Sequence, residues 1–284
     1  MDFNEQYKKI LHICGLVFVI IGLSGCSTLH KTFVNRVKDE FVSQPVSSDS
    51  LLTEEKLAHL PLPVKKYIIL SGAVGKSIPR NFRLEFSALM IAKPGAKPMK
   101  AQSIQYNFFT DKARIFFMTA SKLLIPFRVL HTYRNQQATM VVRIASLFNV
   151  VNASGSGLTE AETVTLLNDM CLFAPGSLID KRLNWKELSP VSAEVALTNG
   201  QYKVKAILYF NDAGELIDFY SEDRSALQPD GTLLKAPWST PVKNYQEYDG
   251  IRIPTYGETI WHYKDGDFTY GKFTLKSIEY NVRQ

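Results

Sequence analysis

The sequence predicts an α+β protein: a large, curved antiparallel β-sheet, like an open half-barrel, with an N-terminal helical hairpin and one mid-chain helix. Three observations predict it. Apolar and polar residues alternate over several segments after residue 80, which is typical of half-buried strands. Turn signals such as Asn199-Gly200 and Asp249-Gly250 recur at short intervals, so consecutive strands should pair antiparallel. Aromatic residues make up 12% of the chain, which also favours sheet structure.

The N-terminus has the order of an export signal. Lys8 and Lys9 precede the apolar stretch 10–23, which as a helix spans about 21 Å and is too short for a bilayer core of about 30 Å. The tetrapeptide Leu-Ser-Gly-Cys that ends at Cys26 follows, and it resembles the lipobox of bacterial lipoproteins. The alternative is a chance match inside an uncleaved anchor.

The lipobox resemblance implies cleavage before Cys26 and attachment of lipid to its thiol. Two or more acyl chains, palmitate among them, are enough for stable membrane anchoring, whereas one chain is not. Ser27 stands where an Asp would resemble the inner-membrane retention signal of Gram-negative bacteria. The expected location is therefore the cell envelope, at the periplasmic face of the outer membrane if the host is Gram-negative.

Three segments are expected: a lipoprotein signal peptide over residues 1–25, a polar tether over 26–50 and a single α+β domain over 51–284. The tether holds few large apolar groups, with about one helical turn near residues 33–41. Of the three cysteines, only Cys171 lies outside the signal and the lipid site, so no internal disulfide can form. Cys171 lies in an apolar run and is expected in the core. We therefore expect the domain to fold without the tether.

The elements of the domain follow from local patterns. Residues 51–72 are interpreted as helical, split by Pro61 and Pro63, with a second helix over 64–70. The capping box Thr159-x-x-Glu162 predicts a helix over 160–171. The apolar phase shifts near Gly271, which indicates a β-bulge. The expected strands are 82–90, 104–108, 114–119, 127–133, 139–145, 202–210, 216–225, 256–263 and 268–280.

The charge pattern does not favour a nucleic-acid binder. The formal charge is +6, but Lys and Arg are spread along the chain instead of forming one stripe. A solvated surface near anionic lipid headgroups explains the charge more simply. The partners expected are the membrane, through lipidated Cys26, and an apolar ligand or a protein.

Several motifs of the domain together resemble a bacterial family, domain of unknown function 6544. The resemblance covers about residues 55–282 and brings no known activity or catalytic residue. The lipobox is a departure, since it is not expected across the family. The motifs are Leu60-Pro-x-Pro63-Val64-x-x-Tyr67, Ser71-Gly72, residues 175–185, Gly214-x-x-x-x-Phe219, Asp223-Arg224, Ala236-Pro237-Trp238, Tyr248-x-Gly250-x-Arg252-Ile253-Pro254, Trp261 and Tyr270.

No catalytic, metal or cofactor motif is complete. Residues 70–77 are similar to a phosphate-binding loop, but Leu70 stands at the first glycine position. The five histidines lie far apart, and none has metal-ligand spacing. Glu222 and Asp223 form either an acid/base pair or a structural ion pair at a sheet edge. No cofactor and no metal are expected.

The leading interpretation is a non-enzymatic, membrane-anchored envelope lipoprotein that binds a lipid-like apolar ligand or a protein partner on its curved sheet. Exported carriers of lipids or lipoproteins have this general build, which is an analogy of fold alone. The residues expected to line the groove are Trp185, Arg224, Trp238 and Trp261. Two alternatives remain: an envelope hydrolase with acids near Glu222 and Asp223, and a structural lipoprotein with a filled core.

Overall fold

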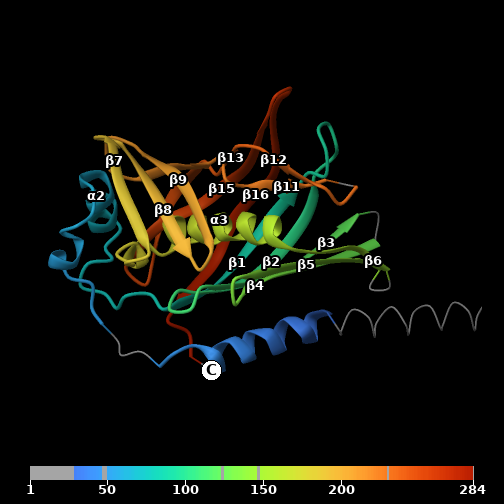
Figure 1. Ribbon diagram of the computed structural model, residues 1–284, viewed down its shortest axis with the longest axis horizontal. Helices are drawn as coiled ribbons and strands as arrows, with labels where there is room; N and C mark the ends of the chain where they lie inside the picture. Colours follow the sequence, from blue (N-terminus) through green and yellow to red (C-terminus); the bar gives the residue numbers. More distant parts are fainter. Residues whose placement is uncertain (1–28, 47–49, 123–124, 146–147, 229, 284) are drawn as a thin grey trace, which may run out of the picture.

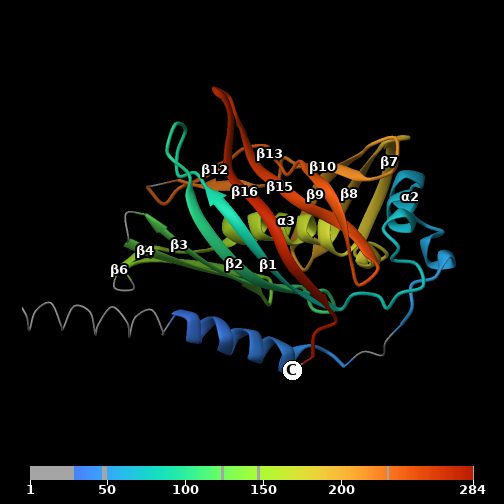
Figure 2. The same ribbon diagram turned by 180° about the vertical axis from the view of Figure 1, so that it is seen from behind.

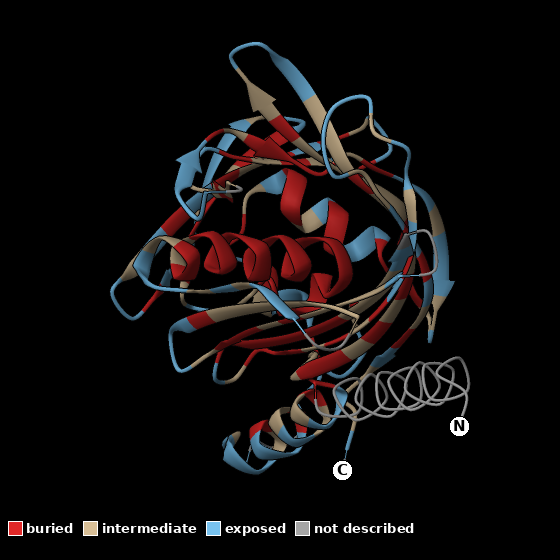
Figure 3. Cartoon of the chain, turned by 90° about the vertical axis from the view of Figure 1, so that its right-hand side faces the viewer, coloured by how far each residue is buried: buried red, intermediate tan, exposed pale blue. Residues whose placement is uncertain are grey.

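The computed structural model describes residues 29–46, 50–122, 125–145, 148–228 and 230–283. The predicted signal and Cys26 lie outside these residues. One 14-stranded antiparallel sheet dominates the fold (Figure 1), in the order β6-β5-β4-β3-β2-β1-β16-β15-β13-β10-β9-β8-β7, with β14 paired to β15. The sheet curls around α3 (Ser156–Phe173), which lies in its concavity (Figure 3). The predicted α+β half-barrel is confirmed.

The strands of this sheet are connected mainly as hairpins. Their bounds are β1 (Asn81–Met90), β2 (Met99–Phe108), β3 (Ala113–Lys122), β4 (Ile125–Arg134), β5 (Gln137–Ile144), β6 (Phe148–Ser154), β7 (Leu183–Ser189), β8 (Ser192–Asn199), β9 (Tyr202–Phe210), β10 (Leu216–Ser221), β13 (Trp238–Ser239), β14 (Val242–Tyr248), β15 (Ile251–Tyr263) and β16 (Gly266–Tyr280). A separate two-stranded ribbon pairs β11 (Ser225–Leu227) with β12 (Leu233–Lys235).

The bulge expected near Gly271 is present between β15 and β16. Thr259 pairs with Gly271, but the next residue, Ile260, pairs with Thr269. Tyr270 is therefore the extra residue of β16, and it lines the cavity described below. The bulge thus places an aromatic hydroxyl inside the half-barrel.

The N-terminal hairpin consists of η1 (Glu54–Leu57), a single 3₁₀ turn, and α2 (Leu62–Leu70). Pro63 lies in the first turn of α2, where its missing N–H leaves no hydrogen bond unmade. Gly72, just past α2, has φ +73°, and a Cβ there would lie 2.7 Å from the Gly250 carbonyl oxygen. Glycine is therefore required where this hairpin meets the β14–β15 turn.

The mid-chain helix α3 is longer than expected and begins differently. It starts at Ser156, after Gly155 with φ +115°, and not at the predicted capping box. The Thr159 hydroxyl lies within the first turn and donates to the Gly155 carbonyl at 2.9 Å. Glu162 does not cap the helix but faces a buried arginine. The capping-box interpretation was wrong, because the local pattern cannot reveal that a buried cation lies opposite Glu162.

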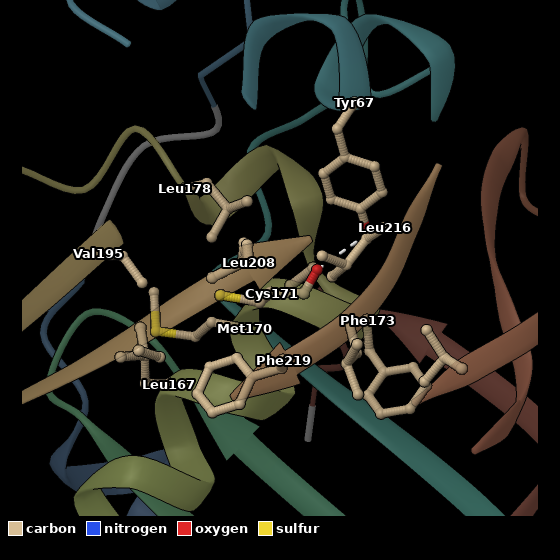
Figure 4. Packing of buried hydrophobic residues seen from close by; sticks show 14 of the residues in the cluster. Tyr67, Leu167, Met170, Cys171, Phe173, Leu178, Val195, Leu208, Leu216 and Phe219 are labelled. Carbon is tan, nitrogen blue, oxygen red and sulfur yellow. Dashed lines mark hydrogen bonds between the residues drawn. The ribbon is translucent and has the colours of Figure 1, made fainter. Parts of the chain in front are cut away.

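The main core lies between α3, α2 and the second half of the sheet, where Leu167, Met170 and Phe219 pack together (Figure 4). The Tyr67 hydroxyl reaches from α2 and donates to the Cys171 carbonyl at 2.9 Å. Cys171 is buried, as predicted, and burial raises the pKa of its thiol far above the ordinary value. The thiol is therefore a core group and not a nucleophile.

Residues 29–43 form a helix on the outer face of the sheet, where a polar tether was expected. Leu29, Phe33 and Val37 recur every four residues and are buried. Phe33 stacks on Phe117 with ring centroids 5.4 Å apart. The composition of the segment is polar, but its few apolar residues form one stripe, which composition alone does not reveal. No helix in the described part of the chain combines the length and apolarity needed to cross a bilayer.

Candidate ligand-binding site

A cavity of about 280 Å³ lies between α3 and the inner face of the sheet. The helix contributes Glu162, Thr165, Asp169 and Leu172, whose spacing of three or four residues puts them on one face. Most of the remaining wall is apolar. Its apolar side chains are Phe86, Met90, Phe116, Met118, Val129, Met140, Phe173, Trp238, Val242, Pro254 and Phe273.

One end of the cavity holds a buried ion cluster centred on Arg114 of β3. Its Nε lies 2.8 Å from Asp169 Oδ2, and its Nη1 lies 3.2 Å from Glu162 Oε2. Its Nη2 donates to Gln105 Oε1 at 3.1 Å. Asp169 Oδ2 also accepts hydrogen bonds from the amides of Gln105 and Asn107, both at 2.9 Å. All five side chains are buried, so the three charged groups are stabilised by these partners and not by water.

Glu162 links this cluster to two further groups. Burial acts to raise the pKa of Glu162, but the neighbouring His131, Arg114 and Arg224 and a hydrogen bond from Thr165 outweigh burial, so its pKa lies below the ordinary value. His131 Nδ1 lies 3.6 Å from Glu162 Oε2. Burial lowers the pKa of His131 to about 4, so the imidazole is neutral at neutral pH. With His131 neutral, two carboxylates face two guanidiniums, those of Arg114 and Arg224.

Arg224 is held by aromatic rings at the cavity wall. Its guanidinium carbon lies 4.3 Å from the ring centroid of Trp238 and 5.1 Å from that of Trp261. Its Nε donates to Thr165 and its Nη1 to the Tyr270 hydroxyl, both at 3.2 Å. Its Nη2 is 3.9 Å from Glu162 Oε1. These contacts fix the orientation of the guanidinium while one edge of it borders the cavity.

Of the four residues predicted to line the groove, the structure brings three together. Arg224 and Trp238 line the cavity, and Trp261 stacks on Tyr270 at 6.0 Å behind them. Trp185 lies apart on β7, where its Nε1 donates to the Leu178 carbonyl at 3.3 Å.

The acidic residues that suggested a hydrolase have separate partners. Glu222 accepts a hydrogen bond from the Tyr220 hydroxyl at 3.1 Å. Asp223 accepts one from the Lys205 amide at 2.8 Å and lies 3.3 Å from Lys235 Nζ. The Asp223 contacts tie its loop to β9 and β12, whereas the Glu222 contact is local, and we interpret the two carboxylates as structural.

A Ser-His-Asp chain lies elsewhere, between β13 and the β15–β16 turn. Ser239 Oγ is 2.9 Å from His262 Nε2, and His262 Nδ1 is 2.7 Å from Asp267 Oδ1. Ser239 is only 2% exposed and does not line the cavity, so a substrate carbonyl has no approach to its oxygen. We interpret these three residues as a structural hydrogen-bond network that links β13 to β15 and β16. No three His, Cys, Asp or Glu side chains converge on a metal site within the described residues.

Four residues of this site were not predicted from the sequence to lie in it: Arg114, His131, Glu162 and Asp169. The available signal was the polar stripe Glu162, Thr165 and Asp169 in an otherwise apolar helix. Such a stripe predicts buried partners once the helix is known to be enclosed. The sequence did not reveal that enclosure.

These features define the class of the protein: an α+β half-barrel that encloses a helix and a largely apolar cavity with a polar, charged end. The chain belongs to the family of unknown function DUF6544, whose model matches residues 50–273. The predicted resemblance is therefore confirmed. No curated protein matches the chain.

Two solved structures are similar in fold at low sequence identity. A LolA superfamily protein from Nitrosomonas europaea is 12% identical, with a TM-score of 0.43, and the alignment covers 78% of this chain and 93% of that one. A DUF1329 family protein from Desulfovibrio piger is 13% identical, with a TM-score of 0.43, and the alignment covers 78% of this chain and 95% of that one.

Proposed function

We propose that this protein is a lipid-anchored envelope protein that binds an amphipathic, lipid-like ligand between α3 and the sheet. The observation that carries the proposal is the cavity itself, which is apolar along most of its wall and charged at one end. An apolar chain would lie against Phe116, Met118 and Met140, and a polar head would exchange hydrogen bonds near Arg224. A filled core, the alternative for a structural lipoprotein, would leave no such space.

The inner face of the sheet extends the apolar wall beyond the cavity. Met118, Val129 and Val142 are opposite one another in register on β3, β4 and β5. The row two residues further out consists of Ala120, Phe127 and Ile144. All six are only partly buried, so they form an apolar trough from the cavity to the sheet rim. A chain longer than the cavity could continue along this trough.

The first test fills the cavity. Met118→Trp is expected to weaken binding of a fluorescent fatty-acid analogue at least about tenfold, which corresponds to about 1.4 kcal/mol. Leu188→Trp, which changes an exposed residue of β7, is the matched control and should bind like the wild type. Native mass spectrometry of the detergent-extracted wild type should also show co-purifying lipid. A wild-type protein that carries no lipid and does not bind the analogue would contradict the proposal.

The anchor is tested at Cys26. In the wild type, the N-terminal peptide of the mature protein is expected to begin at Cys26 and to carry the mass of attached acyl chains. Cys26→Ser should lose this mass and leave the detergent phase on phase partitioning, whereas Cys14→Ser, inside the predicted signal, should keep both properties. A membrane-bound wild type that still begins at Met1 would show that the segment is an uncleaved anchor.

A further inference from the structure

We propose that the sheet rim at the start of β4, the end of β5 and the start of β6 contacts the surface of the bilayer, and that the apolar trough opens there. The rim is defined by Ile125, Arg128, Arg143, Phe148 and Val150. The role as a portal rests on the proposed lipid-binding function, and the membrane contact rests in part on the proposed lipid anchor at Cys26. The occupant of this surface is an anionic lipid bilayer.

The rim exposes three large apolar side chains to solvent. Ile125 is 47% exposed, Phe148 is 64% exposed and Val150 is 52% exposed. The start of β4 and the end of β5 form one edge, since the Ala145 amide donates to the Pro126 carbonyl at 2.9 Å. Three large exposed apolar residues at one edge of the sheet indicate a site that contacts an apolar partner.

The charge of this part of the sheet favours an anionic partner. Residues 113–159 contain five Lys and Arg and no Asp or Glu, and of these Arg114 and Arg134 pair with carboxylates of other elements. Arg128 and Arg143 are directly opposite each other in the register of β4 and β5. Among the described residues, neither forms an ion pair with a carboxylate. Like charges at opposed positions repel, and anionic headgroups would relieve that repulsion.

The N-terminal helix points toward this rim. Phe41, near the end of the helix, packs on Phe108, whereas His30, near its start, packs on Phe117 of β3, with centroids 4.9 and 5.4 Å apart. Followed from Phe41 back to His30, the helix therefore runs along β3 toward the end of β3 that precedes β4. Figures 1 and 2 both show the start of this helix on the side of β6. Cys26 lies only four residues before His30 in the sequence. A lipid attached to Cys26 would therefore favour an orientation in which the rim faces the membrane.

The test measures the depth of a label on the rim in the full-length, lipidated protein. Phe148→Cys, in a Cys14→Ser background, is labelled with an environment-sensitive fluorophore, while buried Cys171 remains unlabelled. The protein is reconstituted into vesicles of phosphatidylcholine and phosphatidylglycerol that contain a spin-labelled lipid quencher. Leu188→Cys, an exposed apolar position on β7, is the control. Quenching is expected to be several-fold stronger at position 148 than at position 188, and equal quenching would overturn the proposal.

A second variant tests the charge. Adding Arg128→Glu and Arg143→Glu to the labelled Phe148→Cys protein should reduce its quenching at least about twofold in vesicles that contain phosphatidylglycerol. The same change should have little effect in pure phosphatidylcholine. Unchanged quenching in both would overturn the assignment of an anionic bilayer. Binding of the fatty-acid analogue in detergent does not depend on the rim, so failure there would count against the proposed function alone.

Discussion

Replacing Arg114 with methionine is expected to lower the free energy of unfolding by about 3–5 kcal/mol. The side chain is buried beside two carboxylates, those of Glu162 and Asp169, at 3.2 and 2.8 Å. Without the guanidinium, Asp169 loses its ion-pair partner, and Glu162 keeps only Arg224, 3.9 Å away, in a site with little water. One of them must then take up a proton or draw in water, and either change costs stability.

Urea denaturation measures this loss, with Arg83→Met as the matched control. Arg83 is on β1 of the same sheet but pairs with Glu85 and Glu279 at the surface, so its loss should cost at most about 1 kcal/mol. Asp169→Asn keeps the shape of the site and should cost about 1–3 kcal/mol. Adding Asp169→Asn to Arg114→Met should recover part of the loss. Equal costs for the two arginine variants would mean that the cluster is not the buried, water-poor network that we infer.

Replacing Phe33 with alanine is expected to cost about 3 kcal/mol and to loosen the N-terminal helix from the sheet. The Phe33 ring is buried between the helix and the sheet, where it contacts Phe117 and Tyr106 with centroids 5.4 and 6.2 Å apart. Once the helix leaves, the outer-face side chains of Phe108 and Phe117 become exposed, so the variant should bind a hydrophobic dye.

Thermal melting and dye binding together check this expectation. Val42→Ala is the control, since Val42 lies near the end of the same helix and is 86% exposed, and it should change stability by less than about 0.5 kcal/mol. Composition alone predicts that the domain from residue 51 folds unaided. The packing of the helix predicts instead that the truncated protein is less stable and binds more hydrophobic dye. A truncated domain that melts cooperatively at the wild-type temperature would favour the prediction from composition.

The fold class was predictable because its signals are local. Alternation over residues 82–90 reports a strand with one buried face, and Phe82, Leu84 and Phe86 are indeed buried. Turn pairs such as Asp249-Gly250 supply the left-handed backbone, with φ +52° and +74°, that tight hairpins require. The bulge near Gly271 was recognised from a shift of phase alone. Each of these features depends on neighbours within a few residues.

The candidate site was predictable only in part. Arg224, Trp238 and Trp261 drew attention as unusual residue types, and tertiary contacts do bring them together. Trp185, chosen by the same reasoning, lies elsewhere on β7, because residue type does not report which strand reaches the concavity. The N-terminal helix was predicted only as about one turn near residues 33–41, because its apolar stripe is narrow and only docking on β2 and β3 buries it.

By itself, the sequence determined the half-barrel class, the family and a lipobox at Cys26 whose acylation remains a prediction. The tertiary structure alone decided where the charges meet. Arg114 and Glu162 are 48 residues apart in the chain, and Arg114 and Asp169 are 55 apart. Spacing of that length carries no geometric information, because the intervening strands can take many paths. The curl of the sheet around α3 removes water from these groups. Once buried, the charged side chains can be stabilised only by hydrogen bonds and ion pairs with one another.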